Sequence, residues 1–152
     1  MGTGKNRIEE VVKAVIYKDQ KYLLQLRDDN PAISSPNTWG FFGGGVDDGE
    51  THEEALIREL NEELNWKPKK IELFHIENSL KTKYYSIYFN TSIKQLCLCE
   101  GQEMKWYYSE EIFELSNTPS IVKKIMKMHK VFMKNDKLLN NARSNYTDTD
   151  KA

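Results

Sequence analysis

Acidic side chains crowd around one arginine between Gly44 and Trp66, in the sequence GGVDDGETHEEALIRELNEELNW. If Thr51 to Leu64 is helical, at about 100° per residue, Glu59, Glu62 and Glu63 fall on one face. Carboxylates held together repel one another unless a positive charge lies beside them. Hard divalent cations prefer oxygen ligands. The spacing therefore predicts a metal site on this helix.

The helix that must position these carboxylates carries its own boundaries. Thr51 followed by Glu54 is a capping box at its start, and Asn65 suits a left-handed stop at its end. An apolar stripe for burial adjoins the acidic face: Leu56, Ile57, Leu60 and Leu64. Four glycines precede the helix and allow a tight loop or a close approach to a ligand: Gly43, Gly44, Gly45 and Gly49.

Gly44, five residues, Glu50, seven residues, and then Arg58-Glu59-Leu60-x-Glu62-Glu63 resembles the Nudix box of the Nudix hydrolases. The family's glycine near the end of the box is replaced by Asn65, followed by Trp66 where an aliphatic is usual. A looser resemblance runs from about Val11 to Met128. It implies an α/β/α sandwich with a mixed sheet and a loop-helix-loop catalytic motif.

The resemblance further implies a hydrolase for a nucleoside diphosphate linked to another group, with Mg²⁺ or Mn²⁺ as cofactor. Glu59, Glu62 and Glu63 are then the metal ligands, and Arg58 orients Glu62 through a charge-assisted hydrogen bond. Glu50, at the helix entrance, is expected to be structural or to support the metal ligands from outside. The general base stays open between a glutamate of the box and one from a distant loop. A solvated acidic helix is the alternative, but it has no reason to follow three glycines or to keep these separations.

Beyond the box, a segment from Cys99 to Trp106 lies where MutT-type relatives supply a further glutamate to the metal. Glu100 matches best and Glu103 is the second choice; an ordinary loop acid is the alternative for both. Asn117 precedes the last helix as a base-reading asparagine does in MutT-type enzymes, and its amide could pair with a purine edge. Helix entry is the alternative role for Asn117.

Other side chains could contact the substrate. Arg27, at the end of a strand, could reach a phosphate or a base, and a surface charge is the alternative. Gly43 and Gly44 let the backbone approach the ligand. Several aromatic residues could stack on a base, although aromatics on alternating strand positions are more often core: Trp39, Phe41, Tyr84, Tyr85 and Tyr88. The three histidines are scattered and form no ligand set: His52, His75 and His129.

Length and composition predict one compact domain over residues 1–134 and a polar, mobile tail over 135–152. The chain has 152 residues, 39% of them hydrophobic, and a net charge of −1, so a basic surface for nucleic acid is not expected. No membrane span or leader is recognised, and a cytoplasmic location follows by default. Cys97 and Cys99 are interpreted as reduced and half-buried. The protein is expected as a monomer or homodimer.

Hydrophobic periodicity predicts the remaining elements. A hairpin turn at Lys18-Asp19-Gln20 joins the first two strands, and Asp28 to Asn37 is a loop. A helix begins after Pro119 and contains Ile121, Ile125, Met128 and Phe132. The predicted strands are Val11–Tyr17, Lys21–Leu26, Trp39–Phe42, Ile71–Ile76, Lys83–Ile93, Leu96–Cys99 and Met104–Tyr107.

The leading prediction is a pyrophosphohydrolase that cleaves a nucleoside triphosphate, canonical or oxidised, to monophosphate and pyrophosphate. The small size of the chain and the MutT-like features after the box favour it. A nucleotide-sugar or dinucleotide hydrolase is the enzymatic alternative, with the loop from Asp28 to Asn37 holding the second moiety. A nucleotide-binding sensor without turnover is the non-enzymatic alternative.

Overall fold

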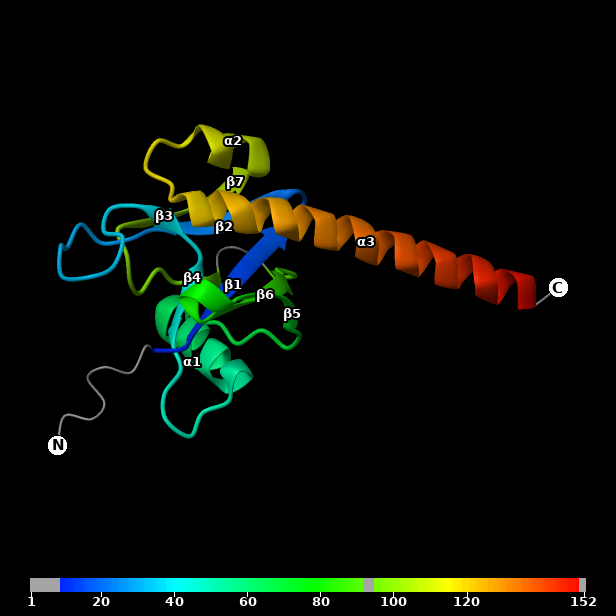
Figure 1. Cartoon of the computed structure of the whole chain (residues 1–152), viewed down its shortest axis with the longest axis horizontal. Helices are drawn as coiled ribbons and strands as arrows, with labels where there is room; N and C mark the ends of the chain where they lie inside the picture. The colour runs from blue at the N-terminus through cyan, green and yellow to red at the C-terminus, as the bar shows by residue number, and fades with distance from the viewer. Residues whose placement is uncertain (1–8, 92–94, 151–152) are drawn as a thin grey trace.

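A mixed β-sheet lies between helices in the computed structural model of the chain, which describes residues 9–91 and 95–150 (Figure 1). Among these residues the sheet has seven strands. The strands are β1 (Val11–Lys18), β2 (Lys21–Leu26), β3 (Trp39–Gly40), β4 (Phe42–Gly45), β5 (Glu72–Glu77), β6 (Thr82–Tyr88) and β7 (Glu103–Tyr108). The helices are α1 (His52–Leu64), the short 3₁₀ helix η1 (Asn78–Leu80), α2 (Ser109–Glu114) and α3 (Ser120–Asp150).

Strand β1 is the centre of the sheet. The main path is β3-β2-β1-β6-β5, while β4 also pairs with β1 and β7 with β2. Only the β1–β6 pairing is parallel among the pairings of the described strands. The β1–β4 pairing aligns Lys13 with Gly43 and Val12 with Gly44, so the glycine loop is held directly against the central strand.

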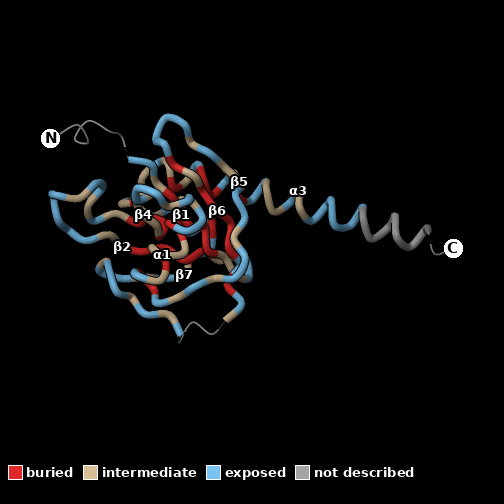
Figure 2. The backbone as a smooth tube through the Cα atoms, turned by 90° about the horizontal axis from the view of Figure 1, so that it is seen from below, coloured by how far each residue is buried: buried red, intermediate tan, exposed pale blue. Residues whose placement is uncertain are grey.

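Alternate side chains of β1 enter two separate cores, one on each face of the sheet. Val12, Ala14 and Ile16 pack against Leu56 and Leu60 of α1. The other core lies beneath α3 and is formed by side chains from both sheet and helices, including Val15, Leu24, Tyr84, Ile112, Ile125 and Met126. Figure 2 shows the buried positions concentrated along the strands between these layers. The α/β/α sandwich is confirmed.

Helix α1 begins and ends as its sequence predicts. Thr51 accepts from the backbone amide of Glu54, and the Glu54 carboxylate accepts from the Thr51 amide, each at 3.1 Å. Asn65 ends the helix with φ 52° and ψ 44°. The predicted hairpin is also present, since Asp19 and Gln20 have φ of 49° and 67° and join β1 to β2 by a two-residue turn.

Three of the predicted strands differ from the structure. Leu96 to Cys99 is not a strand, because the amides of Cys97 and Cys99 donate to the carbonyls of Leu64 and Glu63 at the end of α1. The strand predicted to reach Ile93 ends at Tyr88, and Ile93 itself lies outside the described residues. Phe41 separates β3 from β4 within the predicted strand Trp39–Phe42.

The cysteine interpretation is half right. Cys97 and Cys99 are free thiols, as expected, but both are exposed and not half-buried. Their segment runs along the end of α1, where its backbone satisfies helix carbonyls, and the two side chains stay open to solvent. They lie 3.2 Å apart, Sγ to Sγ.

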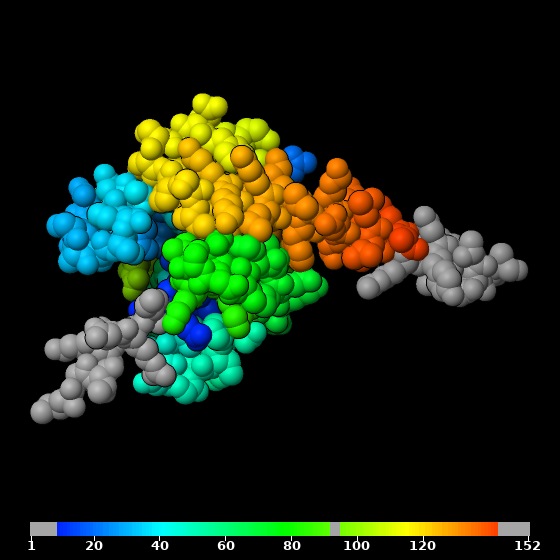
Figure 3. Space-filling view, in the orientation of Figure 1, coloured from blue at the N-terminus to red at the C-terminus, as the bar shows by residue number. Residues whose placement is uncertain are grey.

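Helix α3 starts after Pro119, as predicted, but continues for 31 residues through the segment expected as a polar tail. Its first turns pack on the sheet, and its later turns project beyond the rest of the molecule (Figures 1 and 3). Leu138 and Leu139 are exposed there. In the part of the chain that the structure describes, no helix is long and apolar enough to cross a membrane.

Candidate functional site

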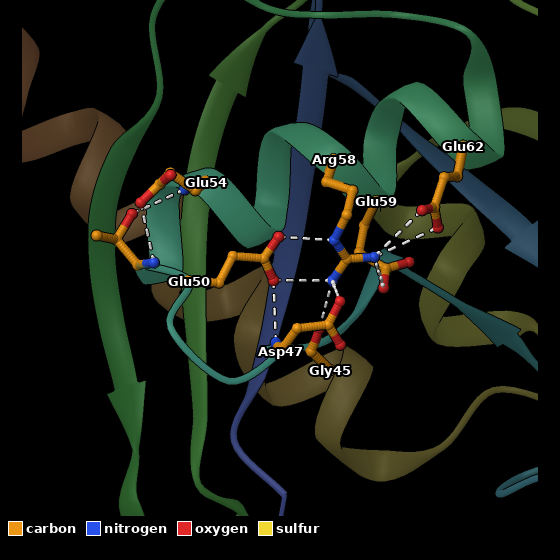
Figure 4. Close-up of polar contacts among 8 residues, drawn as sticks. Gly45, Asp47, Glu50, Glu54, Arg58, Glu59 and Glu62 are labelled. Atoms are coloured by element: carbon orange, nitrogen blue, oxygen red, sulfur yellow. Dashed lines mark hydrogen bonds and ion pairs between the residues drawn. The ribbon is translucent and has the colours of Figure 1, made fainter.

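Arg58 is the centre of the polar network at the start of the acidic face of α1 (Figure 4). Its Nε and Nη2 donate to the two carboxylate oxygens of Glu50 at 2.7 and 3.0 Å, and Nη2 also donates to the carbonyl oxygen of Gly45 at 2.9 Å. Asp47 lies 3.4 Å from Nη2. The hydrogen bond from Arg58 is the main cause of the lowered pKa of Glu50. Arg58 thus ties the loop before α1 to the helix.

The other terminal nitrogen of Arg58 holds two predicted metal ligands together. Nη1 donates to Glu59 at 3.0 Å and to Glu62 at 3.3 Å. Figure 4 shows both carboxylates on the side of the guanidinium away from Glu50. Arg58 therefore contacts Glu62, as the sequence predicted, but its bidentate partner is Glu50.

Glu63 is the most deeply buried acid of the helix, with 2% of its surface exposed. Its carboxylate accepts from the Gly43 amide at 3.0 Å and from Gln25 Nε2 at 3.3 Å. Burial raises the pKa of Glu63 to about 7, opposed by the Lys13 ammonium and supported by the Glu59 carboxylate. A buried carboxyl with this environment is poised to gain from a cation.

Glu59, Glu63 and Glu100 line one pocket of about 440 Å³. Burial is the main cause of the raised pKa of Glu59, and the charges of Glu62 and Glu100 add to it. Gly43, Gly44 and Gly45 form one wall, and a Cβ atom on Gly44 would collide with the Glu59 carboxylate. The absence of a side chain at Gly44 therefore leaves room for the Glu59 carboxylate in the pocket.

The donor set fits a hard divalent cation by its chemistry, because three carboxylates share a pocket. Burial raises the pKa of Glu59 and of Glu63, and the charge of Glu100 adds to both shifts. Among the described residues, no group of three or more histidine, cysteine, aspartate or glutamate side chains is arranged so that it could hold a metal ion. Arg58 holds Glu59 and Glu62, while Gly43 and Gln25 hold Glu63. Each carboxylate has about four acceptor sites on its two oxygens, so these hydrogen bonds leave lone pairs for an ion.

A second pocket, of about 320 Å³, adjoins the first, and both are lined by Val11, Lys13, Arg27 and Ser34. Trp39, Phe41 and Tyr84 belong to its lining, although all three also pack in the core beneath α3 and are only 4 to 6% exposed. Arg27, a predicted substrate contact, therefore lies where the two pockets meet. Its Nε donates to the carbonyl oxygen of Ser34 at 3.0 Å, so this hydrogen bond does not use its terminal nitrogens.

The structure places other predicted residues outside both pockets. Asn117 donates from Nδ2 to the carbonyl oxygen of Asn37 at 3.2 Å, and its own carbonyl oxygen accepts from the Trp39 amide. Glu103 lies on β7 at the edge of the sheet. Burial raises the pKa of Tyr107, and the charge of Glu103 adds to this shift. Tyr85 packs in the core beneath α1 and donates to Glu53, while Tyr88 is exposed.

The histidines are also apart from the acidic pocket. His129 lies on α3 and is buried against the sheet, where it bonds to Tyr22. His75 contacts Glu77, and His52 contacts Glu10. None of the three lines either pocket.

Sequence reasoning missed Lys13 and Gln25, which line the acidic pocket. Each interrupts an otherwise apolar strand, VVKAVIYK and KYLLQL. A polar residue within such a run was the available signal, since a strand side chain facing the interior needs a partner.

The comparisons with known proteins identify the family and the fold of this chain. Residues 8–127 match the family described as NUDIX domain. The chain is 38% identical over 72 residues to an RNA pyrophosphohydrolase of Shewanella pealeana, a match covering 47% of this chain and 40% of that protein. The chain thus spans about 40% of the length of this curated relative.

Two solved structures share the fold. A MutT NUDIX hydrolase from Burkholderia pseudomallei superposes with a TM-score of 0.66 at 19% identity, covering 81% of this chain and 98% of that one. The ORF135 protein of E. coli gives a TM-score of 0.63 at 25% identity, with 86% and 94% covered. Since the family match spans most of the chain, this protein belongs to the NUDIX domain family.

Proposed function

We propose that the protein is a metal-dependent hydrolase of a nucleoside diphosphate linked to another group. The leading substrate is a nucleoside triphosphate, canonical or oxidised at the purine, and the products are the monophosphate and pyrophosphate. NUDIX family membership supports the reaction class. Mg²⁺ or Mn²⁺ is the proposed cofactor and the cytoplasm the proposed location.

The observation that carries the proposal is the continuity of two chemically different pockets. One contains Glu59, Glu63 and Glu100, and the other is walled by Trp39, Phe41 and Tyr84. Lys13 and Arg27 line both. A nucleotide has the same order of parts, with an aromatic base at one end and anionic phosphates at the other.

The proposed reaction is an anhydride hydrolysis. A water oxygen forms a bond to phosphorus, the bond from that phosphorus to the bridging oxygen breaks, and a carboxylate of the pocket takes the water proton. Glu59, Glu62, Glu63 and Glu100 would hold the ion, which supplies charge stabilisation for the phosphates and a more acidic water. Arg58 keeps Glu59 and Glu62 in place, and Gly43 and Gly44 are the proposed backbone contacts to the phosphates.

The general base remains a choice between a glutamate of α1 and Glu100. Asn117 remains the candidate for reading the base edge, and it would have to release the carbonyl oxygen of Asn37 to do so.

A second candidate substrate is RNA, since the curated relatives with similar sequences carry the name RNA pyrophosphohydrolase. The net charge of −1 and a pocket of about 320 Å³ favour a single nucleotide instead. Two further candidate functions are the hydrolysis of nucleotide sugars or dinucleotides and nucleotide sensing without turnover.

The test is product analysis across substrate classes, with Mg²⁺ and with EDTA. The panel contains canonical and oxidised nucleoside triphosphates, a nucleotide sugar, a dinucleotide polyphosphate and a short RNA with a 5′-triphosphate. Mg²⁺-dependent release of pyrophosphate from a free triphosphate supports the proposal. Preference for the RNA or the nucleotide sugar would replace the leading substrate, and binding without turnover on any of them would support the sensor.

A further inference from the structure

Lys13 lies in the central strand at the point where the two pockets join. Its register partners are Gly43 on β4 and Tyr84 on β6, so one neighbour belongs to the acidic pocket and the other to the aromatic one. Its side chain lines both pockets. Any ligand that spans them must pass this lysine.

Charges of both signs act on the Lys13 ammonium. Burial lowers the pKa of Lys13, and the nearby Arg27 guanidinium lowers it further, whereas the Glu63 and Glu59 carboxylates act in the opposite direction. Among the described residues, neither Lys13 nor Arg27 forms an ion pair with a carboxylate within 4.0 Å. The two cations therefore repel each other, and among the described residues neither forms an ion pair that would offset the repulsion.

The hydrogen bonds of both side chains are incomplete. Lys13 Nζ donates to the carbonyl oxygen of Phe41 at a long 3.5 Å, and an ammonium has three donors. Arg27 uses Nε for Ser34, and its terminal nitrogens make no hydrogen bond to the described residues. An anion placed between them would satisfy these donors and offset their repulsion.

We propose that Lys13 is a specificity-determining residue that, together with Arg27, binds the phosphate attached directly to the nucleoside. This contact places the base in the pocket of Trp39, Phe41 and Tyr84 and directs the remaining phosphates towards Glu59, Glu63 and Glu100. The inference rests on the proposed function for its substrate class. It adds a cation outside the acidic motif that distinguishes a nucleotide from a nucleoside.

The experiment measures ligand binding without turnover, with EDTA present, so that its outcome is separate from that of the hydrolysis assay. The probes are GMP and AMP against guanosine and adenosine, followed by quenching of tryptophan fluorescence, because Trp39 lines the aromatic pocket. The variants are Lys13→Met, Lys13→Gln and Lys13→Arg. Lys21→Met is the matched control, since Lys21 lies over the Tyr108 ring and lines neither pocket.

The wild type should bind a monophosphate about tenfold or more tightly than its nucleoside, the effect expected of charge-assisted hydrogen bonds. Lys13→Met should lose most of this preference while nucleoside affinity stays unchanged. Lys13→Arg should retain part of it, and Lys21→Met all of it. If Lys13→Met does not fold, Lys13→Gln, which can still donate to Phe41, gives the same comparison.

A wild type without preference for the monophosphate would overturn the proposal, as would Lys13 variants with an unchanged preference. If the monophosphate binds as expected but no triphosphate is hydrolysed, the proposed function fails and the Lys13 contact stands. For any triphosphate that is hydrolysed, Lys13→Met should raise KM more than it lowers kcat. A purely structural lysine would instead lower the melting temperature and leave the ratio of monophosphate to nucleoside affinity unchanged.

Discussion

The guanidinium of Arg58 and the carboxylate of Glu50 meet through two hydrogen bonds, Nε to Oε2 at 2.7 Å and Nη2 to Oε1 at 3.0 Å. Glu50 lies just before α1 and Arg58 lies within it, so this pair fixes the glycine loop relative to the acidic face. The same arginine holds Glu59 and Glu62. Loop position and carboxylate position are therefore set by one side chain.

Arg58→Lys should weaken the proposed metal site through loss of this geometry, because an ammonium cannot reproduce the planar fork of a guanidinium. We expect the Mg²⁺ dissociation constant to rise about tenfold or more, as for other groups that orient metal ligands. Titration calorimetry with Mg²⁺ measures it. Glu54→Gln is the control, since it alters the capping box but not the Arg58 contacts, and should leave Mg²⁺ affinity unchanged. Equal Mg²⁺ affinity of Arg58→Lys and wild type would contradict the role given to Arg58.

Gly44→Ala should impair the metal site, whereas Gly49→Ala should reduce only the stability of the fold. A Cβ on Gly44 would displace the Glu59 carboxylate, so this variant should lose Mg²⁺ affinity and activity. Gly49 has φ 81° with open space around it, so an alanine there costs on the order of 1 kcal/mol of backbone strain and leaves the metal site alone. Thermal melts and Mg²⁺ titrations of both variants separate the two effects. A Gly44→Ala protein with normal Mg²⁺ binding would show that Glu59 has freedom to move.

His129 should make the protein less stable in acid. Its ring nitrogens bond to the hydroxyls of Tyr22 and Ser86, each at 2.8 Å, among the rings of Tyr17, Phe74 and Phe132. Burial lowers the pKa of His129 from 6.5 to about 4. Below pH 6.5 the unfolded chain takes up a proton that the folded protein refuses, so stability is full above pH 6.5 and falls as pH decreases towards 4.

The difference in pKa corresponds to about 3 kcal/mol of unfolding free energy lost between pH 7 and pH 4. Urea unfolding at several pH values measures the slope. His129→Asn removes the titrating group and should flatten this part of the profile, even if the variant is less stable overall. A profile with the same slope in wild type and His129→Asn would assign the acid sensitivity to other groups.

The local features of the acidic helix were predictable from sequence because they depend on neighbours along the chain. The capping box at Thr51 and Glu54, the left-handed stop at Asn65 and the hairpin at Asp19 and Gln20 are all of this kind. The segment from Leu96 to Cys99 was not, because its backbone partners are the carbonyls of Glu63 and Leu64, over 30 residues earlier.

The residues of the site also divide into those predictable from neighbours along the chain and those that depend on distant strands. Glu59, Glu62 and Glu63 follow from helical spacing, whereas Lys13 and Gln25 reach the pocket only through the pairing of β1 and β2 within the sheet. Asn117 was selected for its place before the last helix, and the contact of its amide with the loop carbonyl of Asn37 could not be predicted from that place. Helix α3 continues through residue 150, although a polar, mobile tail was expected from residue 135. Leu138 and Leu139 are exposed there, so burial of an apolar stripe could not have predicted this part of the helix.

The central claim is that buried carboxylates on α1 bind a divalent cation that is required for hydrolysis. Glu63→Gln tests it most directly, because the amide keeps an oxygen to accept from Gly43 while removing the charge. Turnover of the best substrate of the wild type should be measured across Mg²⁺ concentrations, with circular dichroism to show that the variant folds. The proposed site predicts a loss of turnover on the order of 100-fold or more and weaker Mg²⁺ binding. A folded Glu63→Gln protein with wild-type turnover at the same Mg²⁺ concentration would contradict it.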